Sequence, residues 1–314
     1  MDESKNNTKD EYDAAIVGGG PAGLSAAIWS ARYLHATVLV DSGDPRNWET
    51  RAINGYLGLE GITPAELRAR GREDCRALGV DLIDSAVLRV DKEAGGVFAL
   101  ALPGGSRVHA KRLLLAIGVR DVWPEIPGIE RVFGSNAHVC PDCDGYLTRG
   151  RKVVVIGAGR RAVGMALDLS TWTRDIIICT NGRPPELTDE YCAKLDKLNI
   201  PVLTEPVTEV CYSGSEIECL RLANGMQLDA DKVFFTLAQY PADDLGVQLG
   251  CARDDEGHII IDDHHHTSVE NVYAAGDITP GPQLAIRAAQ AGSVAAMAMH
   301  RSLVPPERKL VPLR

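Results

Sequence analysis

The chain has 314 residues, 45% of them hydrophobic and 24% charged, a balance typical of folded globular proteins and long enough for two domains. Its formal net charge of −10 argues against nucleic acids and anionic membranes as partners, because both attract basic surfaces. Since the first fifteen residues lack the apolar core of a signal peptide and no apolar run approaches the roughly 18 residues of a membrane span, we expect a cytoplasmic protein.

A strand, a glycine-rich turn and a helix are predicted first along the chain. Tyr12 to Val17 is a short apolar run, and Leu24 to Tyr33 has the apolar spacing of a packed helix. The turn between them has the spacing G-x-G-x-x-G, which suits the close approach of a pyrophosphate, and Asp41 ends the next strand, where it can accept hydrogen bonds from a ribose. The residues expected to hold a dinucleotide here are Gly18, Gly20, Pro21, Ala22, Gly23 and Asp41.

The cysteines fall into two classes. Only Cys140 and Cys143 form a C-x-x-C, so this pair is the candidate redox site. A zinc site would need two more ligands at suitable spacing, and His138 alone does not complete a set, so no metal is expected. A passive structural pair is the remaining alternative. The other cysteines stand singly and are expected to be buried thiols in a reducing compartment: Cys75, Cys179, Cys192, Cys211, Cys219 and Cys251.

A second strand, turn and helix follow the C-x-x-C. Lys152 to Ile156 predicts a strand, Val163 to Thr171 a helix and Ile176 to Ile178 the next strand. Two nucleotide-binding folds in one chain are therefore indicated, and the fold class is α/β with two Rossmann-like domains. The residues expected at the second nucleotide are Gly157, Gly159, Arg160 and Arg161.

The domain boundaries are predicted from two proline-bearing stretches, Val119 to Pro124 and Gln239 to Ala242. They divide the chain into a first part of one domain (11–120), an inserted domain carrying the C-x-x-C (121–240), and a second part of the first domain (241–314). The last part holds a strand ending in Gly276-Asp277 and an Ala-rich helix from Gln283 to His300. The tract His264-His265-His266 is interpreted as a solvated turn rather than a metal site.

The order of these motifs resembles that of low-molecular-weight thioredoxin reductases, from Tyr12 to about Arg301. The run Leu113 to Gly118 is similar to the family's "ATG" strand, and Thr267 to Asp277 is similar to its second FAD motif. The resemblance implies one FAD in the first site and a homodimer. It also implies a role in FAD binding for Ala116, Gly118, Gly276, Asp277, Gln283, Leu284 and Ala285.

The resemblance further implies roles for the motif Cys140-Pro141-Asp142-Cys143-Asp144-Gly145. Cys143 would face the flavin, Cys140 would exchange with the substrate disulfide, and Asp144 would donate and accept the proton. A role for His138 as a base toward Cys140 is a weaker hypothesis than that of a hydrogen-bonded neighbour.

The pyridine-nucleotide site departs from the family pattern. Where the family carries an arginine cluster for the 2′-phosphate of NADPH, this chain reads Ile178-Cys179-Thr180-Asn181-Gly182-Arg183, without an acidic residue that would favour NADH. Arg160 and Arg161 at a helix N-terminus are each unfavourable by roughly 0.3–1 kcal/mol, so an anionic group is expected nearby. Use of NADP(H) is therefore in doubt, and another nucleotide is an alternative.

Three functions stay open at this point. The first is reduction of a thioredoxin-like protein with electrons from NADPH or from a protein donor such as ferredoxin. The second is oxidation of a small-molecule dithiol with oxygen as acceptor, as in the gliotoxin-type dithiol oxidases that share the fold and the C-x-x-C. The third is an FAD-binding module without turnover, against which the intact Cys140, Cys143 and Asp144 argue.

Overall fold

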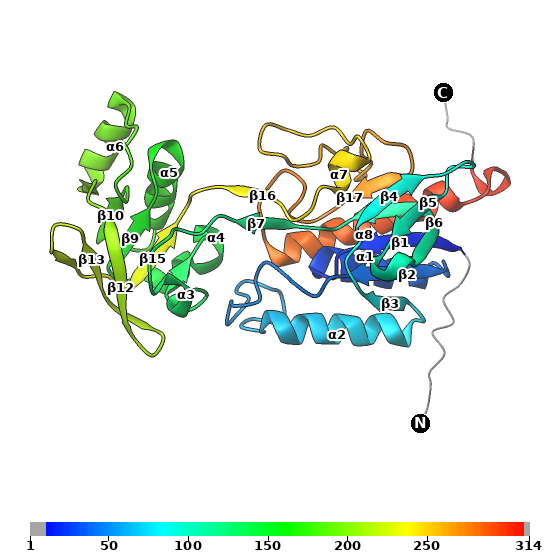
Figure 1. The fold of residues 1–314 in the computed structure, drawn as a ribbon, viewed down its shortest axis with the longest axis horizontal. Helices are drawn as coiled ribbons and strands as arrows, with labels where there is room; N and C mark the ends of the chain where they lie inside the picture. The colour runs from blue at the N-terminus through cyan, green and yellow to red at the C-terminus, as the bar shows by residue number, and fades with distance from the viewer. Residues whose placement is uncertain (1–10, 311–314) are drawn as a thin grey trace. The chain divides into compact units, whose positions relative to one another are not determined.

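The computed structural model describes residues 11–310 and consists of two compact units (Figure 1). Unit 1 comprises the chain up to Trp48, Ala65–Arg120 and the chain from Tyr240 onward, and unit 2 comprises Glu49–Pro64 and Asp121–Gln239. This is the two-domain α/β fold that the sequence predicts. The first ten and the last four residues of the chain lie outside the described range.

Unit 1 is built on a seven-stranded sheet. Its strands are β1 (Tyr12–Val17), β2 (Thr37–Asp41), β3 (Asp81–Asp84), β4 (Arg89–Lys92), β5 (Phe98–Ala101), β6 (Arg107–Leu115) and β17 (Val272–Ala274). The order is β3-β2-β1-β6-β5-β4, with β17 on the far end of β6. Because β6 is long, its first half pairs antiparallel with β5 and its last residues pair parallel with β17. The strands β1, β2, β3 and β6 are parallel neighbours, as a dinucleotide-binding fold requires.

The longer helices of unit 1 cover one face of this sheet, and the short helix at Leu245–Gln248 packs on the other face. The helical elements of unit 1 are α1 (Pro21–Arg32), α2 (Pro64–Ala77), η1 (Pro103–Gly105), α7 (Leu245–Gln248), α8 (Ala285–Leu303) and η3 (Pro306–Arg308). The apolar residues of α1 and α8 form a single core with alternate residues of β1, such as Ala14 and Ile16. A side chain at Gly292 of α8 would put its Cβ 1.9 Å from the carbonyl oxygen of Ala22, so the two helices approach as closely as glycine allows.

Unit 2 is built on a five-stranded parallel sheet with the order β11-β10-β9-β15-β8. Its elements are β8 (Ala137–His138), β9 (Val153–Ile156), β10 (Ile176–Cys179), β11 (Val202–Leu203), β15 (Lys232–Phe235), α3 (Ile129–Val132), α4 (Pro141–Asp144), η2 (Gly145–Thr148), α5 (Gly159–Leu169) and α6 (Asp189–Leu198). A three-stranded antiparallel sheet joins them: β12 (Val207–Ser213), β13 (Glu216–Leu222) and β14 (Gln227–Leu228).

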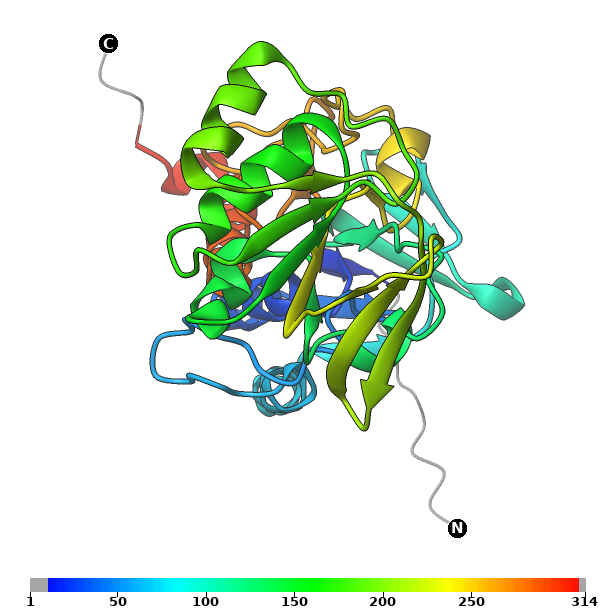
Figure 2. The same ribbon diagram turned by 90° about the vertical axis from the view of Figure 1, so that its left-hand side faces the viewer.

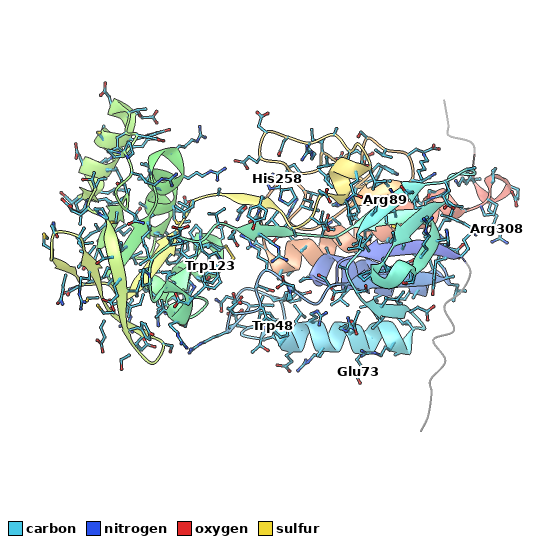
Figure 3. All side chains as sticks on the ribbon, viewed as in Figure 1. Trp48, Glu73, Arg89, Trp123, His258 and Arg308 are labelled. Atoms are coloured by element: carbon cyan, nitrogen blue, oxygen red, sulfur yellow. A yellow bond between two sulfur atoms is a disulfide. The ribbon has the colours of Figure 1, made fainter. Side chains whose placement is uncertain are left out.

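The parallel sheet of unit 2 is buried on both faces. Helices α5 and α6 cover one face and the three-stranded sheet covers the other (Figure 2). Val153 and Val155 belong to the core under the helices, whereas Val154 and Ile156 belong to the core under the three-stranded sheet. This explains why the strand reads as a continuous apolar run instead of an alternating one. Trp123 (Figure 3) extends the core under the three-stranded sheet, and the centroids of its ring and that of Phe133 are 4.1 Å apart.

Two short strands connect the units. They are β7 (Val119–Asp121) and β16 (Gln239–Pro241), which pair with each other and contain two of the four points at which the chain passes from one unit to the other. The segment Glu49–Pro64 lies in unit 2 although the sequence places it inside the first part of the FAD domain. Its Asn54 side chain donates a 3.2 Å hydrogen bond to the carbonyl oxygen of Cys143.

The predicted helices differ from the observed ones mainly at their first turns. α1 begins at Pro21 and α5 at Gly159, three and four residues before the predicted starts. Residues interpreted as turns therefore belong to the helices, because a proline or a glycine is tolerated in a first turn where few hydrogen bonds are lost. Within residues 11–310 no helix is long and apolar enough to cross a membrane.

The interpretation of the histidine tract as solvated is wrong for His265. This residue is 8% exposed, and its Nδ1 lies 2.9 Å from the carbonyl oxygen of Ala274. Burial lowers the pKa of His265 from its usual value. His266 pairs instead with Asp262, whose Oδ2 is 2.8 Å from its Nδ1. In residues 11–310 no group of three metal-ligating side chains comes together.

Candidate functional site

The first glycine turn leaves open space in front of helix α1. Gly18 has a φ of +105°, and a Cβ there would lie 2.3 Å from the carbonyl oxygen of Ala116. A Cβ on Gly23 would lie 1.8 Å from the carbonyl oxygen of Gly18, so both positions must be glycine for the turn to form. Gly20 differs, because a Cβ there would meet nothing within 4 Å. The turn thus has the shape that admits a pyrophosphate at the helix N-terminus.

The carboxylate of Asp41 lies at the end of β2 beside this turn. It is 7% exposed and adjoins Gly19, where a Cβ would come 2.3 Å from Oδ2. Two arginines of α2 that the sequence did not identify hold this oxygen: Arg68 donates a hydrogen bond to it, and Arg72 lies 3.7 Å away. The pair fixes the orientation of the carboxylate, and no local sequence signal connects α2 to β2.

A second polar group of unit 1 joins Asp277 to Gln283. Arg46 donates hydrogen bonds from Nη1 to Oδ2 of Asp277, 3.0 Å away, and to Oε1 of Gln283, 2.7 Å away. Gly276, with φ +83°, lies against the Ala22 side chain of α1, so the strand end that carries Asp277 adjoins the glycine turn. The two predicted flavin motifs therefore converge in unit 1. The residues here fit an FAD, with a glycine cradle for the phosphates and Asp41 and Asp277 as acceptors.

The remaining residues predicted for this cofactor lie at the ends of the same elements. Ala116 is buried directly after β6, and Gly118 has a φ of +70° just before β7. Leu284 is the N-cap of α8 and Ala285 its first residue, while Pro21 and Ala22 open α1. The residues that the resemblance assigns to FAD thus lie at helix N-termini and strand ends of unit 1.

The redox pair forms a disulfide in unit 2. Cys140 and Cys143 are both half-buried and are bonded to each other at the N-terminus of α4. The backbone N–H of Cys143 donates a 3.1 Å hydrogen bond to Sγ of Cys140, as an N-cap does. Gly145 is required next to the pair because a Cβ there would lie 2.3 Å from the ring of Trp172.

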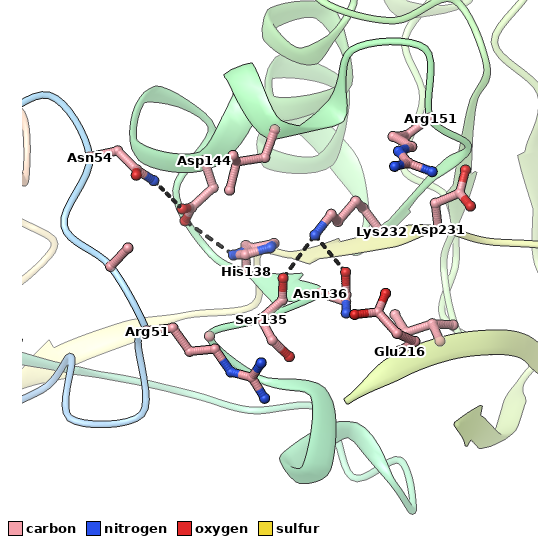
Figure 4. Close-up of a pocket in the computed structure, with 14 residues that line it drawn as sticks. Arg51, Asn54, Ser135, Asn136, His138, Asp144, Arg151, Glu216, Asp231 and Lys232 are labelled. Carbon is pink, nitrogen blue, oxygen red and sulfur yellow. Dashed lines mark hydrogen bonds and ion pairs between the residues drawn. The ribbon is translucent and has the colours of Figure 1, made fainter. Parts of the chain in front are cut away.

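Asp144 is held from two sides (Figure 4). The amide of Asn54 donates a 3.1 Å hydrogen bond to Oδ1, and Nδ1 of His138 lies 3.2 Å from Oδ2. His138 is only 4% exposed and comes from strand β8. His138 therefore contacts the Asp144 carboxylate. This agrees with the interpretation of His138 as a hydrogen-bonded neighbour and not as a base toward Cys140.

A polar pocket of about 390 Å³ adjoins this carboxylate within unit 2 (Figure 4). Asp144 and His138 line it, together with residues of the 49–64 segment and of β13 and β15. Nζ of Lys232 donates hydrogen bonds of 2.8 Å to the carbonyl oxygen of Ser135 and 2.5 Å to Oδ1 of Asn136. Burial lowers the pKa of Lys232 from its usual value. Sequence patterns gave no indication of this pocket.

The second glycine turn is covered by a loop of the same chain. Gly159 opens α5 with a φ of +62°, and its N–H donates a 3.0 Å hydrogen bond to the carbonyl oxygen of Pro185. The carboxylate of Glu186 lies beside it, with Oε2 2.9 Å from the position of a Cβ on Gly159. The loop thus uses the Gly159 N–H, and Glu186 lies in the space in which a nucleotide phosphate would bind.

The other residues of the second turn also contact groups of unit 2. Gly157 packs against the carbonyl oxygen of Thr236, and Arg161 donates a 3.4 Å hydrogen bond to the carbonyl oxygen of Leu237. Arg160 follows Gly159 directly, at the helix end beside the Glu186 carboxylate. The Glu186 carboxylate thus lies at the helix N-terminus at which the two arginines stand. The hydroxyl of Thr180 donates to the carbonyl oxygen of Arg183, 2.6 Å away, and closes the adjoining loop.

The single cysteines are not all buried. Cys192 on α6 is exposed and Cys211 on β12 is half-buried, which corrects the expectation that all six are core thiols. Cys192 lies near the start of α6, where only Leu195 is buried, and Cys211 lies on the antiparallel strand β12.

We expect thiol reagents to distinguish these cysteines in the native protein. Burial raises the pKa of Cys75 to about 11, so at pH 8 its thiolate fraction is on the order of 10⁻³ and reaction is slow. Cys192 should be labelled by a maleimide at least about a hundredfold faster than Cys75, as measured by peptide mass spectrometry. Equal labelling in folded protein, with equal labelling after unfolding as the control, would contradict the burial of Cys75 on α2.

The comparisons with known proteins agree with this geometry. Residues 12–292 match the family described as pyridine nucleotide-disulphide oxidoreductase. The structure superposes on that of HlmI with a TM-score of 0.90 and 32% identity, covering 95% of this chain and 94% of that one. It superposes on a putative thioredoxin reductase, TrxB from Bacillus anthracis, with a TM-score of 0.87 and 28% identity, covering 93% of this chain and 98% of that one.

Curated relatives show the same likeness over part of their length. The F component of alkyl hydroperoxide reductase from Pseudomonas putida is 29% identical over 288 residues, which cover 88% of this chain but 55% of that protein. The chain thus spans little more than half the length of the first curated relatives that it matches. A probable thioredoxin reductase from Arthroderma benhamiae is 29% identical over 93% of this chain and 80% of that protein. The chain belongs to the pyridine nucleotide-disulphide oxidoreductase family.

Proposed function

We propose that this protein is an FAD-dependent thiol-disulfide oxidoreductase in which Cys140 and Cys143 carry electrons between the flavin and a disulfide partner. The observation that carries the proposal is the half-buried Cys140–Cys143 disulfide with the Asp144 carboxylate next to it in the chain. A C-x-x-C at a helix N-terminus stabilises a thiolate, which is the reactive form of cysteine.

We infer the following roles for the three residues. The disulfide opens when it takes up two electrons, which the bound flavin supplies. The Cys140 thiolate then attacks one sulfur of the partner disulfide and forms a mixed disulfide, and the partner's other sulfur leaves and takes a proton from Asp144. Cys143 gives its proton to Asp144, attacks Sγ of Cys140 and releases the second sulfur of the partner. The partner is reduced, and the Cys140–Cys143 disulfide is restored.

We propose that the electron donor is not NADPH bound at the second glycine turn, as it would be in an ordinary thioredoxin reductase. Supporting this is the second glycine turn, where the Pro185 carbonyl oxygen accepts the N–H of Gly159 and the Glu186 carboxylate lies in front of the helix. A nucleotide phosphate would have to displace both groups. The loop after β10 also lacks an arginine pair for the 2′-phosphate. A protein donor such as ferredoxin meets the requirement without this site.

We expect NADPH and NADH to reduce the flavin slowly, with no strong preference between them. Loss of an arginine pair and the negative charge of Glu186 together should weaken NADPH binding by roughly two or more orders of magnitude. Anaerobic stopped-flow absorbance at the flavin band measures this directly. Glu186→Gln should raise the nucleotide affinity severalfold, whereas the exposed Glu190→Gln serves as the matched control. Rapid reduction of the unaltered protein by low NADPH concentrations would overturn this part of the proposal.

The partner is proposed to be a thioredoxin-like protein or a small-molecule dithiol. The second candidate corresponds to the reverse reaction, a dithiol oxidase that passes electrons through the flavin to oxygen, and the covered second nucleotide turn favours it because that reaction needs no reduced nucleotide. Oxygen consumption in the presence of dithiols, compared with disulfide reduction under anaerobic conditions, separates the two directions. Reaction in neither direction would contradict the proposed function.

A further inference from the structure

We propose that Cys211 and Cys219 are a second redox couple of this protein, which a hydroperoxide oxidises to a disulfide between two neighbouring strands. The two residues lie on β12 and β13, an antiparallel pair of strands in unit 2 (Figure 1). In the register of this pair Cys211 stands directly opposite Cys219, and both are free thiols. The fold therefore brings together two cysteines that stand singly in the sequence.

The backbone geometry of this pair suits a disulfide. Residues directly opposite each other in an antiparallel pair have Cα atoms roughly 4.5–5.5 Å apart, within the range of about 4.4–6.8 Å that a disulfide needs. The two thiols are in contact, because the side chain of Cys219 forms a hydrogen bond with that of Cys211. The register shifts directly after the pair, between Cys211 and Tyr212, and such a bulge lets the backbone adjust locally. The S–S bond can thus form without a change in strand pairing.

The pair lies on the outer face of the hairpin. The next pair along the two strands is Val210 and Leu220, which are fully buried in the core under the parallel sheet. Because neighbouring residues of a strand point to opposite faces, Cys211 and Cys219 point away from this core. Packing of the core therefore does not account for the two cysteines.

The two sulfurs have different surroundings. Cys211 is half-buried, whereas Cys219 is 8% exposed. Arg221 donates a 3.6 Å hydrogen bond from Nη2 to Sγ of Cys211 and a 2.8 Å hydrogen bond from Nη1 to Oε2 of Glu209. Burial and the hydrogen bond with Cys211 raise the pKa of Cys219 to about 11, so Cys219 stays protonated near neutral pH. Cys211 is thus the sulfur that meets solvent beside a cation, and Cys219 is the protonated thiol next to it.

Oxidation of the pair proceeds in two steps. The thiolate of Cys211 attacks the terminal oxygen of the hydroperoxide and the O–O bond breaks, which leaves a sulfenic acid on Cys211. The other oxygen leaves as an alcohol, or as water from hydrogen peroxide, with the proton that Cys211 gave up. The sulfur of Cys219 then attacks Sγ of Cys211, the S–S bond forms, and the sulfenic oxygen leaves as water with the proton of Cys219. The two thiols lose two electrons, and the O–O bond takes them up.

The test uses the full-length holoenzyme and follows the two sulfurs directly. Protein freed of dithiothreitol is treated with a small excess of hydrogen peroxide, quenched with catalase and a maleimide, and digested without reduction. A protease that cuts after glutamate separates Cys211 from Cys219 at Glu216 and Glu218, so that only a disulfide keeps the two peptides joined. We expect the joined peptides as the main product of these two cysteines, and their separation when dithiothreitol is added again.

Variants test the roles of the two sulfurs and of the arginine. Cys219→Ser should accumulate the sulfenic acid on Cys211, where dimedone traps it, whereas Cys211→Ser should leave Cys219 unoxidised. Arg221→Gln should slow closure of the disulfide roughly threefold to tenfold, because the cation beside the attacking sulfur is lost. Arg89→Gln is the matched control, because Arg89 (Figure 3) also pairs with a carboxylate on a strand, that of Asp91 in unit 1, and it should leave the rate of closure unchanged.

The peptide map also gives the results that would overturn the inference. One is Cys211 found alkylated, or oxidised to a sulfinic acid, with no joined peptides after peroxide. Another is a disulfide from Cys211 to Cys192 or to a second copy of the chain in place of Cys219. Since Cys140 and Cys143 are read on other peptides of the same digest, failure of this inference is distinguishable from failure of the proposed function.

Discussion

Replacing Cys143 by serine is expected to abolish electron transfer between the flavin and any disulfide partner. The resolving thiol is lost, so a mixed disulfide formed at Cys140 persists, and turnover should fall on the order of 10³-fold or more, as when other covalent nucleophiles are removed. Cys140→Ser should abolish turnover to the same extent, because no nucleophile then addresses the partner. Disulfide reduction by the holoenzyme with an artificial electron donor measures both losses.

The spectra of the two variants should differ although their activities do not. If Cys143 faces the flavin, Cys140→Ser retains a thiolate that gives a charge-transfer band near neutral pH, and Cys143→Ser has no such band. The exposed Cys192→Ser is the matched control and should resemble the unaltered protein in both measurements. Equal spectra for the two active-site variants would mean that the assigned roles of Cys140 and Cys143 are wrong.

Gly20→Val is expected to give folded protein that contains no FAD. A Cβ at this position meets nothing within 4 Å of the protein, so the fold tolerates the side chain, but the valine occupies the space that the pyrophosphate needs. We expect retention of FAD to fall at least about a hundredfold, as shown by the ratio of flavin to protein absorbance after purification. Circular dichroism should remain unchanged.

Two further glycines provide the comparison. Gly164→Ala on α5 also adds a Cβ in open space, but at a helix that is not assigned to the flavin, and it should leave the FAD content intact. Gly23→Val should impair folding itself, because a Cβ there lies 1.8 Å from the carbonyl oxygen of Gly18. A fully flavinated Gly20→Val protein would contradict the placement of FAD at the first glycine turn.

The sequence predicts those parts of the molecule that depend on neighbouring residues. The glycine turn at Gly18 to Gly23 and the C-x-x-C have local spacings with a physical requirement, and a strand before and a helix after each turn made the two-domain α/β fold predictable. Helix starts were less accurate: α5 begins at Gly159 because a glycine can form a first turn as readily as it forms the preceding loop.

Contacts between distant residues could not be predicted in this way. Arg46 reaches Asp277 and Gln283 across more than 230 positions of sequence, and no periodicity connects them. His138 and Asp144 are six residues apart, but their contact depends on where β8 ends and α4 begins. Pro185 covers Gly159 only because the loop after β10 turns back over the helix, and a sequence pattern gives the composition of that loop but not its course.

The central claim is that the flavin and the Cys140–Cys143 disulfide exchange electrons within one protein, and an anaerobic reductive titration with dithionite tests it most directly. The flavin and the disulfide each take up two electrons, so the oxidised holoenzyme should consume about four electrons per FAD before the flavin is fully bleached. Cys143→Ser should consume about two. A holoenzyme that is fully reduced by about two electrons per FAD, with the disulfide still intact by alkylation, would contradict the account.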